Sequence, residues 1–188
     1  DYQGSASMGV VLFADQQLDA NALLKQAELA MYEAKQGSRG SLHFFDSQLE
    51  TAVTERMRIE RELRAGIAGG ELRRHYQPPV AVQDGQLTIV GAEALVRWQH
   101  PERGLLAPGF FITLAEETGL IAPLGRWVLR AACEQLATWK GHPRFSALIL
   151  AVNVSAVQFL EPGFTQEVLA LLQATGAPPA CLKLELTE

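Results

Sequence analysis

Two carboxylates and one amide in this 188-residue chain are candidate metal ligands. Glu93, Asn153 and Glu185 each lie in a segment rich in Leu, Val, Ile and Ala. A carboxylate in such apolar surroundings is costly to bury unless it is paired or binds a metal ion. One such residue alone is more simply explained as a solvated strand end. Three on consecutive strands favour a site, because α/β folds place their sites at strand ends.

These three side chains offer only oxygen atoms to a metal ion. Oxygen ligation selects Mg²⁺ or Mn²⁺ over zinc, so one of these two cations is expected. Arg97 follows Glu93 by four residues, and its guanidinium suits an anionic group such as phosphate. The alternative for Arg97 is a surface ion pair with Glu102 or Glu116.

The segments that carry these residues predict an α/β fold. Helices are predicted at 108–118, 124–140 and 164–175, and strands at 75–82, 87–98, 148–154 and 182–186. The Asp84-Gly85 pair predicts a tight turn, so the first two strands form an antiparallel hairpin. The strand at 148–154 is apolar almost throughout, which predicts burial on both faces, as in a parallel sheet. Together the elements amount to about half of a closed barrel of ~250 residues.

The first 46 residues predict a smaller set of elements. A strand is predicted at 8–13, a helix at 20–36 and a strand at 42–45. Asp19 is expected to cap the start of the helix and Gly37 its end. We interpret this part as the closing piece of a domain. A long helix from the Ser47–Glu50 capping box to about Ile67 should follow, and its buried face changes midway, which places a domain boundary near 49–57.

Composition excludes several classes of protein. The chain has 16 basic and 21 acidic residues, a net charge of −5, and 48% apolar residues, which excludes disorder and low complexity. Its longest near-apolar stretch, 145–154, is too short for a membrane helix of ~20 residues. The basic segment at 51–75 interleaves Arg with Glu, which indicates an ion-paired helix rather than a DNA or RNA surface. Cys133 and Cys181, in apolar contexts, are expected to be buried free thiols of a cytoplasmic protein.

The sequence resembles the EAL domain family, which hydrolyses the bacterial messenger cyclic di-GMP. The resemblance rests on an ordered set of segments: HYQPPV at 75–80, EALVRW at 93–98, APGFFITLAEETGLI at 107–121, NVSAVQF at 153–159 and ELTE at 185–188. Through SMGVVLF, LLKQAELAMYEAKQGSRG and FFD, the first part resembles the end of a GGDEF (diguanylate cyclase-like) domain. The two resemblances imply a GGDEF end at 1–46, a linker helix at 47–60 and the N-terminal part of an EAL domain at 61–188.

The resemblance also implies a fold and a metal site. The EAL fold is a TIM-like (β/α)₈ barrel with an antiparallel first strand, and this chain is expected to supply about its first half. Matched residue by residue, Glu93, Asn153 and Glu185 are implied to bind two divalent cations, Mg²⁺ or Mn²⁺. Glu188 matches a glutamate that supports a loop near the metals.

The implied substrate contacts are Gln77, Leu95 and Arg97. Pro79 replaces the aliphatic residue expected after Tyr-Gln-Pro, which is a mild departure from the family pattern. The downstream Asp-Asp pair, Lys and Glu of the family match no residue up to Glu188. Because the three matched ligands are intact, the intact protein is expected to cleave cyclic di-GMP to linear pGpG. This chain alone, without the downstream residues, is expected to be inactive.

Two other functions stay open at this point. The domain could bind cyclic di-GMP as a receptor without cleaving it, or it could be an interaction domain in which the helix at 47–67 forms a dimer contact. A homodimer is also expected. A sensor region upstream, able to anchor the protein to a membrane, is also compatible with the sequence.

Overall fold

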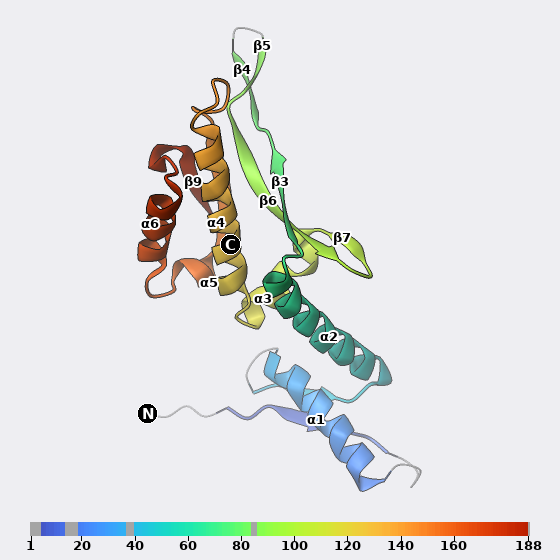
Figure 1. Ribbon diagram of the computed structural model, residues 1–188. Coiled ribbons are helices and arrows are strands. Elements are labelled where there is room, and N and C mark those ends of the chain that lie inside the picture. The colour runs from blue at the N-terminus through green and yellow to red at the C-terminus, as the bar shows by residue number, and fades with distance from the viewer. Residues whose placement is uncertain (1–4, 14–18, 37–39, 84–85, 188) are drawn as a thin grey trace. The chain divides into compact units, whose positions relative to one another are not determined.

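The computed structural model describes residues 5–13, 19–36, 40–83 and 86–187 (Figure 1). The chain divides into two compact units, Asp1–Arg61 and Glu62–Glu188. Over the described residues, no helix combines the length and apolar character that a membrane crossing requires.

The first unit contains two short parallel strands, one whole helix and most of a second helix. Its elements are β1 (Met8–Val10), α1 (Ala20–Gln36), β2 (Leu42–Phe44) and most of α2 (Ser47–Gly69). The backbone N–H of Ala22 donates to Asp19 Oδ1 at 2.7 Å, so the predicted cap of α1 is confirmed, as are the bounds of that helix. Both strands are shorter than predicted. The predicted helix end at Gly37 lies outside the described residues.

Helix α2 changes its buried face along its length. Val53 and Leu63 are fully buried, whereas Met57 between them is 55% exposed. At 3.6 residues per turn, the ten residues from Val53 to Leu63 leave these side chains about 80° apart around the helix axis. The predicted change of face is therefore confirmed.

The second unit is built on a mixed sheet. Among the described residues this sheet has five strands: β3 (Leu72–Gln77), β6 (Gly91–His100), β7 (Gly104–Leu106), β8 (Ile149–Ser155) and β9 (Leu182–Thr187). The order is β3-β6-β8-β9, with β7 paired to the far end of β6. β3 is antiparallel to β6, while β8 and β9 run parallel to it. An antiparallel first strand before parallel strands is the arrangement that the sequence predicted.

A separate hairpin of β4 (Val80–Gln83) and β5 (Gln86–Ile89) extends beyond one end of this sheet (Figure 1). The prediction of two unbroken strands at 75–82 and 87–98 is wrong. Pro78 and Pro79 have no N–H to donate, so the ladder is interrupted there. Across the gap, the N–H of Val90 donates to the Pro79 carbonyl at 3.1 Å. The predicted turn at Asp84-Gly85 lies outside the described residues.

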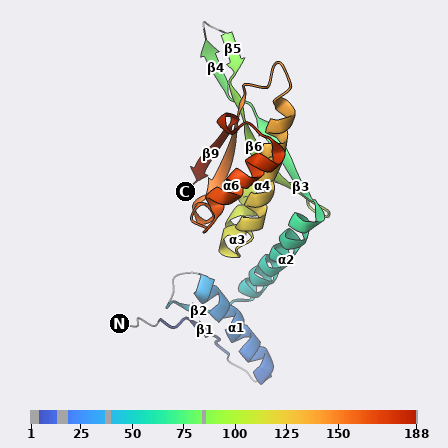
Figure 2. The ribbon, with the colours of Figure 1, turned by 60° about the vertical axis from the view of Figure 1, so that its left-hand side comes forward.

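Helices connect the strands. They are the 3₁₀ helices η1 (Pro108–Phe110) and η2 (Pro179–Cys181), and α3 (Ile112–Glu117), α4 (Ile121–Trp139), α5 (Ala156–Phe159) and α6 (Phe164–Thr175) (Figure 2). The predicted bounds of α6 are confirmed, and Gly176 ends it with a φ of 70°. α4 begins three residues earlier than predicted, because Pro123 is tolerated in a first turn. The helix predicted at 108–118 is two pieces, η1 and α3, and neither β7 nor α5 was predicted.

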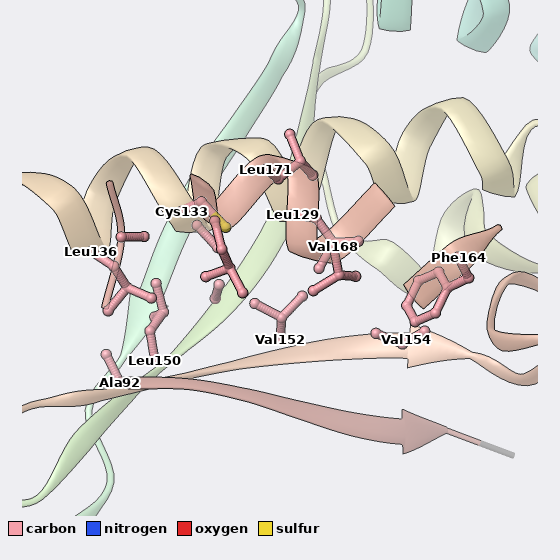
Figure 3. Packing of buried hydrophobic residues seen from close by; sticks show 14 residues of the cluster. Ala92, Leu129, Cys133, Leu136, Leu150, Val152, Val154, Phe164, Val168 and Leu171 are labelled. Atoms are coloured by element: carbon pink, nitrogen blue, oxygen red, sulfur yellow. The ribbon is translucent and has the colours of Figure 1, made fainter. Parts of the chain in front are cut away.

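The core lies between one face of the sheet and helices α4 and α6 (Figure 3). It includes Leu150, Val152 and Val154 of β8, Leu129, Cys133 and Leu136 of α4, and Val168 and Leu171 of α6. Ile149 and Asn153, which alternate with the buried residues of β8, are exposed. The prediction that this strand is buried on both faces is therefore wrong for the described residues. The other face is free to carry polar chemistry.

The two cysteines differ in their surroundings. Both are free thiols, but Cys133 is fully buried and Cys181 only partly so. The prediction of two buried thiols therefore holds for Cys133 alone.

Candidate functional site

Strand β6 directs three of the predicted site residues to one face of the sheet. Side chains alternate along a strand, so Glu93, Leu95 and Arg97 leave on the face opposite the one carrying Ala94 and Trp98. Ala94 and Trp98 are buried, whereas the other three are partly exposed. The predicted site residues of β6 therefore lie on the face of the sheet that points away from α4.

Glu93, Asn153 and Glu185 come together on this face. The Asn153 Nδ2 donates to Glu93 Oε1 at 2.6 Å, and Asn153 is the register partner of Glu185 on β9. All three lie within strands, not at strand ends as predicted: Glu93 is near the start of β6, and the other two are mid-strand. β8 and β9 each end one residue later than predicted, at Ser155 and Thr187, which places Asn153 and Glu185 inside their strands.

The donors in this set fit a hard divalent cation. Because the Asn153 nitrogen faces Glu93, the Asn153 Oδ1 and the second Glu93 oxygen remain available as acceptors. Carboxylate and amide oxygens are the ligands that Mg²⁺ and Mn²⁺ take. No cluster of three or more His, Cys, Asp or Glu side chains able to hold a metal occurs among the described residues. The set therefore consists of two carboxylates and one amide.

Lys183 is a member of this site that the sequence analysis missed. Its Nζ lies 2.7 Å from Glu185 Oε1, and it shares a face with Glu185 because it lies two residues earlier on β9. The ammonium competes with any cation for that oxygen. Counting back two positions along the predicted strand could have found it.

Gln77 lies directly opposite Glu93 across the β3–β6 pair. The two residues line a cavity of about 360 Å³, together with Glu185, Lys183 and the proline pair at the base of the β4–β5 hairpin. The structure thus places the predicted substrate contact Gln77 next to two of the predicted ligands.

A second cavity, of about 450 Å³, has Leu95 and Asn153 in its wall, along with residues of α3, α4 and α5. Arg97 lies two residues after Leu95 on β6, and its Nη1 donates to the Val96 carbonyl at 2.8 Å. Within the described residues it forms an ion pair with neither Glu102 nor Glu116. The predicted residue Glu188 lies outside the described part of the chain.

Contacts with helix α2 and with Glu71 just after it fix the C-terminal end of β6. Trp98 Nε1 donates to Glu71 Oε2 at 2.9 Å. His100 is 3% exposed, and its Nδ1 accepts from two backbone N–H groups of the following turn. Its Nε2 therefore carries the proton and donates to Glu62 Oε2 at 3.0 Å. These contacts hold the strand segment that carries Arg97.

Tyr76 anchors β3 to α4 on the helix side of the sheet. Its hydroxyl donates to Gln135 Oε1 at 3.2 Å, and its ring centroid lies 5.7 Å from that of Trp139. Burial raises the pKa of Tyr76, an effect that the nearby Arg74 guanidinium opposes. Tyr76 therefore stays a neutral donor, and it fixes the strand from which Gln77 extends.

A family profile described as the EAL domain matches residues 60–188. Because this match covers more than half of the chain, the chain belongs to the EAL domain family. Its α/β fold is that of the EAL domain, as solved structures of such domains also show.

Characterised relatives match almost the whole chain. Over 98% of its length it is 39% identical to the bifunctional diguanylate cyclase/cyclic di-GMP phosphodiesterase MucR of Pseudomonas aeruginosa, and 37% identical to the cyclic di-GMP phosphodiesterase PdeR of Escherichia coli. The chain spans 26% and 27% of those proteins, about a quarter of their length. The solved complex of the PaMucR phosphodiesterase with c-di-GMP is 41% identical, with a TM-score of 0.64, over 70% of this chain and 52% of that one.

Proposed function

We propose that this chain is part of a cyclic di-GMP phosphodiesterase that cleaves the messenger to linear pGpG. The observation that carries the proposal is the gathering of Glu93, Asn153 and Glu185 on one sheet face, with Gln77 directly opposite Glu93. The names of MucR and PdeR support the substrate, and EAL phosphodiesterases generally depend on divalent metal ions.

Each residue has a role that its chemistry suits. A divalent cation, Mg²⁺ or Mn²⁺, bound at this site supplies Lewis acidity and a water of lowered pKa. Glu93 and Glu185 provide carboxylate charge for it, and Asn153 provides a neutral oxygen. Gln77 offers an amide donor and acceptor to the substrate, while the Arg97 guanidinium suits a phosphate oxygen. Leu95, in the wall of the 450 Å³ cavity, offers apolar contact.

The proposal extends to the organisation of the protein. Residues 1–46 form the end of a GGDEF domain, 47–60 a linker helix, and 61–188 the N-terminal part of an EAL barrel. MucR, to which 98% of this chain aligns, carries both activities in its name, which supports the presence of both domains. The remaining ligands would come from outside these residues, with Glu188 supporting a loop. A homodimer and a cytoplasmic location stay predictions.

The second candidate is a receptor that binds cyclic di-GMP without cleaving it. One observation favours it: the Lys183 ammonium already pairs with Glu185 at 2.7 Å and so neutralises one of the proposed metal ligands. A receptor needs the substrate contacts but not a metal of high affinity.

Chromatographic detection of pGpG distinguishes the two candidates. The full-length protein that contains this chain is incubated with cyclic di-GMP, with and without Mg²⁺ or Mn²⁺, and binding is measured in parallel. Metal-dependent appearance of pGpG is expected. Binding without cleavage at saturating metal would favour the receptor, and the absence of both binding and cleavage would overturn both candidates.

A further inference from the structure

Two arginines face each other on the sheet face that carries the proposed site. Arg73 of β3 is the register partner of Arg97 of β6, four residues from the Gln77–Glu93 pair on the same face. Directly opposed residues in an antiparallel pair have Cβ atoms about 4.5–5.5 Å apart, and like charges there are destabilising. A pair of cations placed in this way calls for a compensating anion.

Within the described residues, neither arginine has a carboxylate partner. Arg73 Nη1 donates to the carbonyls of Gly70 and Leu72 at 2.7 and 2.9 Å, and Arg97 Nη1 donates to that of Val96 at 2.8 Å. A guanidinium has five N–H donors, so most of those on each arginine remain for a ligand.

The neighbouring residue on β3 shows the contrast. Arg74 lies on the opposite face of the strand, where its Nη1 is 3.7 Å from Glu134 Oε2 of α4. The strand therefore satisfies one cation with a carboxylate on the helix side. On the site side it leaves two cations facing each other.

The charge on the site face is divided along the strands. Glu93 and Arg97 are four positions apart on β6, about 13 Å at ~3.3 Å per residue. Arg73 Nη1 donates to Gly70, away from Glu93, and an arginine side chain that turns toward Glu93 would shorten that gap. The carboxylates for a cation therefore lie at one level, and the two guanidiniums lie two same-face positions further along the strands. A ligand with two phosphates, one of them reached by an arginine side chain that turns toward Glu93, matches this division.

We propose that Arg73 and Arg97 together bind one phosphate of a cyclic dinucleotide, while the other phosphate lies at Glu93, Asn153 and Glu185. The identity of the ligand rests on the proposed function. The new element is Arg73, a substrate-binding residue that relieves its repulsion with Arg97 by sharing an anion. Two guanidiniums on one phosphate give charge-assisted hydrogen bonds of defined direction.

The matched control is the neighbouring arginine. In the full-length protein, the KM and kcat for cyclic di-GMP are compared for Arg73→Gln, Arg73→Lys and Arg74→Gln. Arg73→Gln should raise KM about tenfold or more with a smaller change in kcat, because the phosphate it holds is not the one cleaved. Arg73→Lys should lie in between, since an ammonium keeps the charge but loses the planar fork. Arg74→Gln should stay within about twofold of wild type.

A double substitution tests whether one phosphate is shared. If Arg73 and Arg97 bind the same group, Arg73→Gln with Arg97→Gln should lose less affinity than the product of the two single losses. If Arg73→Gln binds cyclic di-GMP as tightly as Arg74→Gln, the inference is overturned, and Arg73 serves only to hold the carbonyl of Gly70. If Arg73→Gln weakened the binding of linear pGpG but not that of cyclic di-GMP, the inference would also be overturned. The arginine pair would then bind the terminal phosphate of the product.

Failure of the proposed function would look different. If the wild-type protein neither binds nor cleaves cyclic di-GMP, the anion site is tested with pyrophosphate by thermal shift. Stabilisation by pyrophosphate that Arg73→Gln abolishes and Arg74→Gln keeps would support the arginine pair. Equal stabilisation in all three proteins, or none in the wild type, would overturn it.

Discussion

The side-chain amide of Asn153 donates a hydrogen bond of 2.6 Å to the carboxylate of Glu93, sixty residues earlier in the chain. It joins β6 to β8 on the face opposite the helices, between residues that the two strands' register does not pair directly. Glu93 Oε1 accepts this hydrogen bond, which orients the carboxylate and leaves its second oxygen available to a ligand. Asn153 in turn keeps its own oxygen free.

Replacing Glu93 by Gln should lower the turnover of cyclic di-GMP in the full-length protein by orders of magnitude while the fold survives. The substitution keeps the shape of the side chain but removes the carboxylate charge from the proposed metal site. Turnover and circular dichroism are measured together. Glu134→Gln, in helix α4 on the other side of the sheet, is the control and should keep its activity. Near-wild-type hydrolysis by Glu93→Gln would show that the assigned role is wrong.

Chelation should abolish activity, and Mg²⁺ or Mn²⁺ should restore it, because all the proposed ligands are oxygen atoms. Full activity after exhaustive chelation, with no metal found by elemental analysis, would contradict the metal site.

Replacing Lys183 by Ala should tighten metal binding about fivefold. A unit charge at ~4 Å is worth about 1 kcal/mol in water, and the Lys183 ammonium competes for the Glu185 oxygen. Calorimetric titration of the full-length protein with Mn²⁺ measures the effect. Lys140→Ala, an exposed residue after α4, should leave the affinity unchanged. Weaker binding in Lys183→Ala would indicate that the lysine instead positions Glu185 for the metal.

Helices 20–36 and 164–175 could be predicted to the residue, because apolar spacing and clear end signals both lie within each segment. The separate β4–β5 hairpin could not be predicted. The interruption between β3 and β4 depends on whether the sheet needs hydrogen-bond donors at Pro78 and Pro79, which the local sequence does not show. The antiparallel first pair and the parallel strands that follow it could also be predicted from local sequence.

Cross-strand neighbours lay beyond local sequence. The pairing of Arg73 with Arg97 depends on the register of two strands separated by a hairpin. Shifting that register by one residue would move Arg73 to the other face. The contact of Lys183 with Glu185 was within reach, because it needs only the period of a single strand.

Gly66 of helix α2 should not tolerate Ala. A Cβ there would lie 2.6 Å from Trp98 Nε1 and 2.7 Å from Glu71 Oε2, in the contact that holds the end of β6. Overpacking of this kind costs about 1–3 kcal/mol, against a gain of about 1 kcal/mol in helix propensity. Urea denaturation should show a net loss of stability. Gly69→Ala, with no atom within 4 Å of the added Cβ, should be neutral or stabilising, and equal behaviour of the two variants would refute the contact.

Cys181 should react with a thiol reagent at neutral pH, and Cys133 only after unfolding. Cys133 is fully buried, and burial, with a smaller effect of Glu134, raises the pKa of its thiol, so its thiolate is scarce. Reaction with a chromogenic disulfide should show one fast thiol, which Cys181→Ser removes. Because the folded state holds the Cys133 proton more tightly, this group's contribution to stability declines as pH rises above the ordinary thiol pKa. Two fast thiols in the native chain would contradict the packing around Cys133.

The 188-residue chain, produced alone, should self-associate and should not cleave cyclic di-GMP. Among the described strands β9 pairs only with β8, so its other edge presents unpaired N–H and C=O groups. Leu186 on β9 is 61% exposed, and apolar surface on a strand with an open edge recruits a partner. Analytical ultracentrifugation should show dimers or larger species whose proportion rises with concentration. A dispersed monomer with a cooperative melt would show that the open edge of β9 does not drive self-association. Metal-dependent pGpG formation by that monomer would show that these residues already complete the site.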